Sequence, residues 1–134
     1  MSVRVWVVVK KYLGGKNIDM FDFEKLDLYH VIRNQNKEVL KFIFAHRTMD
    51  SYIKDQWKRA SISSVLNLSE GVGRISDADK KHFFTMARGS VYECTALLQL
   101  VRDLDLIEET TFKSLYDTYE QISKMLLGMY RSKG

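Results

Sequence analysis

Small and polar side chains recur at helical spacing within residues 56–74, QWKRASISSVLNLSEGVGR. Steps of four and three residues place one set of them on a single side of a helix: Gln56, Ala60, Ser63, Asn67, Glu70 and Arg74. The segment ARGSVYE, residues 87–93, contains small and charged side chains that could pack against this set. Polar groups held between helices add little net stability, but they fix register and partner choice. We therefore predict a partly buried polar network of Arg59, Ser63, Asn67, Glu70, Arg74, Arg88 and Glu93.

This polar network has two interpretations. In the first, its members only satisfy one another and hold two helices in register, which is the commoner role of charged pairs between helices. In the second, Arg59, Asn67, Glu70 and Arg74 form a contact surface for a partner or another subunit. The sequence leaves both interpretations open.

Gly89 is the unusual residue of the segment 87–93. Glycine inside a helix costs about 1 kcal/mol relative to alanine, so its presence there calls for a structural reason. We predict that Gly89, with Ala87 and Ser90, lets the backbone of one helix approach Ala60 and Ser63 of another closely.

Catalytic and metal-binding patterns are absent from the sequence. A di-iron bundle needs two Glu-x-x-His motifs, and the nearest approach is a single Asp79-x-x-His82. His30 and His46 stand in separate segments without metal-ligand spacing. Cys94 falls on an apolar stripe, as a small buried thiol does. We therefore expect no catalytic residue, no metal and no cofactor, and we expect the protein not to be an enzyme.

Four long amphipathic segments must position these side chains. They are predicted to run from about residue 23 to 44 with Asp22 as N-cap, from Thr48 or Asp50 to Glu70, from Ser76 or Asp77 to Leu104, and from Thr110 or Thr111 onward. Glycines at 71 and 73 are expected to stop the second helix. The sequence contains no proline. We predict an all-α fold, an antiparallel up-and-down four-helix bundle spanning residues 22–134.

The expected apolar stripes follow the same spacing. The first helix repeats Leu26, Tyr29, Ile32, Leu40 and Ile43, interrupted by Asn36; the third carries Phe83, Ala87, Ser90, Cys94, Leu97, Val101 and Leu104; the fourth carries Phe112, Leu115, Tyr119, Ile122, Leu126 and Met129. The second helix has a more apolar line beside its polar seam, made by Ile62, Val65, Leu66 and Val72.

Residues 1–21 do not share the helical pattern. Alternating valines from Val3 to Val9 are typical of a short strand, which Gly14-Gly15 then breaks. The segment is either an arm that pairs with another subunit or an extension upstream of the native start. We favour the second hypothesis, with Met20 as the native first residue.

The charge of the chain is distributed unevenly. The whole sequence of 134 residues has a net charge of +4, but residues 1–19 hold four basic residues and one acidic residue. A nearly neutral bundle is weak support for nucleic-acid binding. A single cysteine and the lack of an apolar run long enough to span a bilayer favour a cytoplasmic protein without a membrane partner.

Motifs in three segments carry a resemblance to a known family. FEKLDLY at residues 23–29, QWKRASIS with NLSEGVGR at residues 56–74, and FFTMARGSVYE at residues 83–93 resemble the bacterial four-helix bundle proteins, also called 23S rRNA intervening-sequence proteins. The resemblance covers Phe23 to about Arg131. It implies a four-helix bundle that assembles into a homopentamer, and a fold similar to the accessory subunit of diversity-generating retroelements. Val65-Leu66 departs from the usual Pro-Ser pair, and Ser69 replaces a usual alanine.

Two functions follow as hypotheses. The first is a homo-oligomeric scaffold, a homopentamer by resemblance, that binds a protein or RNA partner and no small-molecule substrate. The alternative is an RNA-binding accessory protein whose basic rim contacts phosphates through Arg59, Arg74, Lys80, Lys81 and Arg88.

Overall fold

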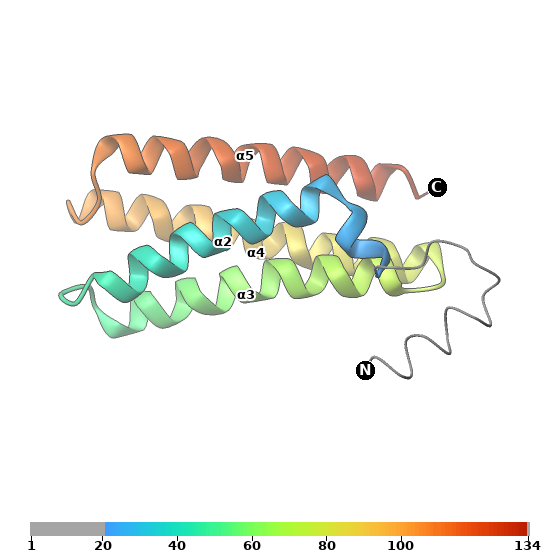
Figure 1. Ribbon diagram of the computed structural model, residues 1–134, viewed down its shortest axis with the longest axis horizontal. Coiled ribbons are helices and arrows are strands. Elements are labelled where there is room, and N and C mark those ends of the chain that lie inside the picture. Colours follow the sequence, from blue (N-terminus) through green and yellow to red (C-terminus); the bar gives the residue numbers. More distant parts are fainter. Residues whose placement is uncertain (1–20, 134) are drawn as a thin grey trace, which may run out of the picture.

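The computed structural model describes residues 21–133, and the predicted strand at 3–9 and the predicted start at Met20 lie outside them. The described chain contains a short 3-10 helix, η1 (Asp22–Lys25), and four α-helices: α2 (Asp27–Ala45), α3 (Ser51–Gly73), α4 (Asp77–Asp103) and α5 (Glu109–Arg131). Successive helices run in opposite directions and are joined by short connections (Figure 1). The predicted all-α, up-and-down four-helix bundle is confirmed.

Two of the predicted helix starts coincide with side-chain caps. The Asp50 carboxylate accepts hydrogen bonds from the backbone N–H groups of Tyr52 and Ile53, and the Ser76 hydroxyl accepts one from Asp79. These oxygens satisfy donors that the first turn of a helix otherwise leaves unpaired.

The start of the first helix differs from the prediction. Asp22 is not an N-cap, because it opens η1, and α2 begins only at Asp27, after Leu26. The physical reason lies in the aromatic contacts: the Phe23 ring packs edge-on against Tyr29, and His30 Nε2 donates to the Glu24 carbonyl oxygen at 2.7 Å. These contacts fold the preceding turn back onto α2.

Two other helix boundaries shift by a few residues. Helix α3 continues through Gly71 and ends at Gly73 instead of Glu70. Helix α5 begins at Glu109, just before the two threonines that were expected to start it.

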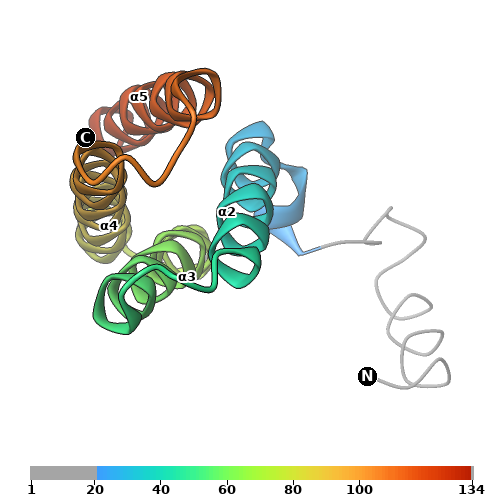
Figure 2. The ribbon, with the colours of Figure 1, turned by 90° about the vertical axis from the view of Figure 1, so that its left-hand side faces the viewer.

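The helices pack around the bundle in the order α2, α3, α4, α5 (Figure 2). Backbones approach closely between α3 and α4, α4 and α5, α2 and α3, and α2 and α5, but not along the diagonals of the described bundle. The centre is filled by large apolar side chains that include Ile32, Val39, Trp57, Leu68, Phe84, Leu98, Ile122 and Leu126.

The stripe predicted for α5 is buried from Phe112 to Leu126, as expected. The stripe predicted for α4 is correct at Ala87, Ser90, Cys94 and Val101. At its other positions Phe84 and Leu98 are buried instead of Phe83 and Leu97, and Leu104 is exposed. Helix α4 lies between two neighbours, so its buried face turns toward α5 as well as α3.

Candidate functional site

The predicted polar seam forms in part, at the contact between α3 and α4. Asn67 donates to the carbonyl and the hydroxyl oxygens of Ser63, each at 2.9 Å. The Ser90 hydroxyl donates to the Ser63 hydroxyl at 2.9 Å, which links the two helices. Ser63, Asn67 and Ser90 thus form hydrogen bonds with one another, and the bond between Ser63 and Ser90 fixes the register of α3 against α4.

The charged residues of the predicted network lie elsewhere. Arg74 pairs with Glu70 at 3.8 Å in an exposed position, and its guanidinium lies 4.5 Å from the centre of the Phe83 ring. Arg88 turns toward α5. Arg59 and Glu93 are exposed on the outer faces of α3 and α4.

The five cations that were predicted to contact phosphates have different partners and lie on different faces of the bundle. Lys80 donates to the Val72 carbonyl oxygen at 2.7 Å, near the end of α3, and the Lys81 ammonium lies over the Tyr130 ring. With Arg59 on the outer face of α3 and Arg88 directed at α5, these side chains do not share one surface.

The close helix approach predicted at Gly89 is wrong. A Cβ atom added at Gly89 meets nothing within 4 Å, because this residue faces outward while Ala87 and Ser90 face the core. The tight position is Gly71, where an added Cβ would lie 2.7 and 2.8 Å from two carbons of the Phe84 ring.

A second polar cluster lies deeper in the bundle. Asn36 donates to the Ser61 carbonyl oxygen at 2.6 Å, and the Ser64 hydroxyl donates to the same oxygen at 2.7 Å. Gln35 donates to the Leu115 carbonyl oxygen at 2.8 Å. The signal for this cluster in the sequence is Asn36, which interrupts the apolar repeat of the first helix.

The buried thiol and phenol sit beside this cluster. Cys94 Sγ lies 3.8 Å from the Ser61 hydroxyl, and Trp57 Nε1 donates to the Tyr119 hydroxyl at 3.1 Å. Burial raises the pKa of Cys94 from 9.0 to about 11 and raises the pKa of Tyr119 well above 10.0. Both groups therefore stay protonated near neutral pH, so Cys94 is a poor nucleophile.

The described residues contain no group of three or more histidine, cysteine, aspartate or glutamate side chains that could hold a metal ion. No helix within residues 21–133 has the length and apolar character required to cross a membrane.

The outer face of the α3–α4 pair exposes apolar side chains. Ile62 and Leu66, four residues apart on α3, are 48% and 58% exposed. On α4, Met86 and Leu100 are also exposed at positions that helical spacing places on one side, and so is Leu104, which directly follows the helix. We call these five residues the outer apolar strip.

Comparisons with known proteins give a consistent picture. A family model described as 23S rRNA-intervening sequence protein matches residues 24–128. A solved structure from Bacteroides thetaiotaomicron, described as a protein with unknown function from the S23 ribosomal protein family, is 18% identical to this chain. It covers 77% of this chain and 97% of its own, with a TM-score of 0.71, which shows a shared fold. No curated protein matches significantly.

Proposed function

Because this chain belongs to the 23S rRNA-intervening sequence protein family, we propose that it is a non-enzymatic helical scaffold that assembles with copies of itself. Five copies is the number that the family resemblance implies. The ring so formed would present the helix faces that remain outside as binding surfaces for a partner.

The outer apolar strip is the observation that supports this proposal. Ile62 and Leu66 on α3, with Met86 and Leu100 on α4, expose apolar surface on two adjacent helices. Apolar patches that extend over neighbouring elements mark interaction sites, because burying them in a contact removes apolar area from water. A self-contact through the strip would bury these side chains.

The interior offers support of a different kind. Among the described residues, every buried side-chain nitrogen or oxygen has a hydrogen-bond partner. Cys94 and Tyr119, the buried groups with raised pKa values, have their hydrogen-bond partners on α3, in Ser61 and Trp57. The polar groups of the core are thus occupied in holding the bundle together, as expected for a scaffold.

Light scattering coupled to size exclusion tests the proposal. The wild-type chain should elute as an oligomer, and Leu66→Glu should shift the mass toward the monomer because it introduces a charge into the strip. Phe44→Glu is the matched control, since Phe44 is also strongly exposed but lies on α2. Circular dichroism should show that all three proteins remain helical.

Two results would contradict the proposal, and a third would favour the alternative function. A monomeric wild-type protein removes the assembly itself, and an unchanged mass for Leu66→Glu removes the strip as its contact. Titration with a structured RNA tests the alternative function: binding that weakens steeply as salt rises would assign the protein to nucleic acid instead.

A further inference from the structure

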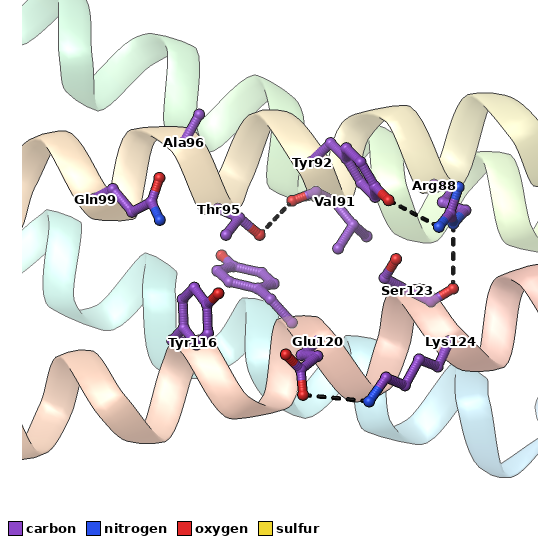
Figure 3. A pocket seen from close by; sticks show the side chains of 11 residues that line it. Arg88, Val91, Tyr92, Thr95, Ala96, Gln99, Tyr116, Glu120, Ser123 and Lys124 are labelled. Carbon is purple, nitrogen blue, oxygen red and sulfur yellow. Dashed lines mark hydrogen bonds and ion pairs between the residues drawn. The ribbon is translucent and has the colours of Figure 1, made fainter.

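The face between α4 and α5 contains a groove, and Figure 3 shows the larger of its two hollows. The hollows have volumes of about 430 and 390 Å³, and Arg88 and Tyr92 line both of them. The first hollow extends along α4 to Gln99, and the second extends in the other direction to Thr85. Arg88 therefore lies between two hollows that follow one another along α4.

Arg88 has only neutral partners among the described residues. Its guanidinium donates to the Tyr92 hydroxyl at 2.7 Å and to the Ser123 carbonyl oxygen at 3.4 Å (Figure 3). The side chain is half-buried. A guanidinium has five N–H donors in a planar fork that matches a carboxylate, so donors remain for a carboxylate that enters the groove.

The outer apolar strip has a carboxylate in its middle. Met86, Glu93 and Leu100 follow one another on α4 at steps of seven residues, which helical spacing places on one side of the helix. Glu93 is exposed and takes part in no ion pair within residues 21–133. The α4 part of the strip therefore presents an apolar side chain, an unpaired carboxylate and a second apolar side chain in line.

The strip and the groove lie on adjacent sides of the bundle. Because the helices are ordered α2, α3, α4, α5 around its centre, the strip follows the α3–α4 side and the groove follows the α4–α5 side (Figure 2). Two different contact surfaces that face in directions at roughly a right angle turn each copy relative to the last, which allows a ring to close. Contact surfaces on opposite sides extend the copies into an open line instead.

The apolar parts of the two surfaces match in position along the bundle. In a ring whose axis runs along the helices, the same residue of every copy lies at the same height. Met86 of one copy is then level with Thr85 of the next, which lines one hollow. Leu100 is level with Gln99, which lines the other hollow.

The charges match in the same arrangement. Glu93 of one copy is level with Tyr92 of the next, and the Arg88 guanidinium reaches the hydroxyl of Tyr92. We propose that the groove receives the outer apolar strip of a second copy of this chain, with Glu93 of one copy paired with Arg88 of the next. An arginine–carboxylate pair is strong and directional, so it sets the register of the contact. Enclosed between two apolar contacts, the pair is screened by salt much less than an exposed one.

This inference rests on the proposed self-assembly and assigns the surface that the strip meets. The α2–α5 side lies opposite the strip, so contact through it does not close a ring. On the α2–α3 side, Lys58 lies 6.0 Å from the centre of the Phe44 ring. Arg33 and Lys37 share that face of α2 by helical spacing, and both are exposed without a carboxylate partner in the described part of the chain. Covering these cations with a strip that offers Glu93 alone is unfavourable.

A charge exchange in the full chain tests the inference by light scattering coupled to size exclusion. Arg88→Glu and Glu93→Arg each place like charges across the contact, so each should lower the mass toward that of one chain. The double variant restores an opposite pair between copies and should recover the wild-type mass. Within one chain the two residues are five apart on different sides of α4, so recovery reports a contact between copies. Recovery also excludes misfolding caused by the loss of Arg88.

Lys37→Glu, a charge reversal on α2, is the matched control and should keep the wild-type mass. An unchanged mass for Arg88→Glu, while Leu66→Glu lowers it, would overturn the inference and leave the self-assembly in place. A double variant that stays at the lower mass, or an equal loss of mass in Lys37→Glu, would also overturn it. A monomeric wild-type protein would remove the self-assembly and the inference together.

Discussion

At the scale of single residues, two glycines of neighbouring helices have opposite surroundings. Gly71 faces the Phe84 ring so closely that a methyl group has no room, whereas Gly89 faces open space. We expect Gly71→Ala to lower the free energy of unfolding by about 1–3 kcal/mol, because overpacking displaces the ring. Gly89→Ala should raise it by about 0.5–1 kcal/mol, because alanine favours the helix.

Urea unfolding followed by circular dichroism measures both changes. The two variants add the same methyl group to a helical residue, Gly71 in the last turn of α3 and Gly89 in the middle of α4, so each is a control for the other. A loss of stability in Gly89→Ala would restore the close approach that the sequence predicted there and that the structure contradicts.

Cys94 gives the folded protein a defined pH dependence. Burial raises its pKa from 9.0 to about 11, so the folded state holds the thiol proton more tightly than the unfolded chain does. This contribution to stability is complete below the unfolded pKa and is lost as pH rises toward 11. The difference between a pKa of 9.0 and one of about 11 corresponds to about 2.7 kcal/mol, which is the upper limit of the loss.

Urea unfolding at a series of pH values from neutral to alkaline tests this expectation. The free energy of unfolding should fall more steeply above pH 9 in the wild type than in Cys94→Ala, which has no thiol to ionise. The variant should keep some slope, because burial also raises the pKa of Tyr119. Identical pH profiles for the two proteins would show that the thiol ionises equally easily in both states.

At the scale of the helices, one hydrogen bond links two helices whose backbones do not approach each other closely. The backbones of α3 and α5 make no close approach, yet Trp57 Nε1 donates to the Tyr119 hydroxyl across the core. Tyr119→Phe leaves the buried indole N–H without an acceptor, which should cost about 1–3 kcal/mol. Tyr116→Phe, on the same helix but half-buried, is the control and should change stability little.

Chemical unfolding followed by tryptophan fluorescence measures this loss. Unchanged stability in Tyr119→Phe would mean that the indole finds another acceptor, and the hydrogen bond would then not be needed to hold the diagonal pair together.

The helices themselves could be predicted where local chemistry determines them. Caps such as Asp50 and Ser76 act within one turn, so the sequence narrows each of them to two neighbouring candidates, and the hydrogen bonds of the structure select one. The buried face of α4 depends on two neighbouring helices, which is why Phe84 and Leu98 replaced the expected Phe83 and Leu97. The start of α2 depends on an aromatic contact that spacing alone does not reveal.

The same distinction between local and long-range contacts applies to the candidate sites. The link between Ser63 and Asn67 follows from residues four apart on one helix and was visible in the sequence. The direction of Arg88 depends on the position of α5, because its guanidinium donates to the Ser123 carbonyl oxygen, and the hollow that Arg88 lines forms only where α4 and α5 pack together. Asn36 marked a buried polar cluster, but its partners on α3 could be identified only in the folded bundle.

At the scale of the whole molecule, charge and apolar surface suggest different ways to assemble. Residues 25–88 hold 12 basic and 7 acidic residues, whereas residues 93–120 hold 2 basic and 7 acidic residues. Copies that met through these opposite charges would separate as salt rises, since screening shortens from about 10 Å at 0.1 M to about 3 Å at 1 M ionic strength. Contact through the outer apolar strip does not weaken in this way.

We therefore expect the oligomer mass measured by light scattering to stay constant between about 0.1 and 1 M sodium chloride. Leu66→Glu should keep its reduced mass over the same range, because the cost of burying a carboxylate in the contact is a desolvation cost that salt does not screen. If the wild-type mass falls as salt rises, the contact between copies lies in the charged segments and not in the outer apolar strip. The assembly would then depend on charge, and substitutions that neutralise residues within 93–120 should disrupt it while Leu66→Glu should not.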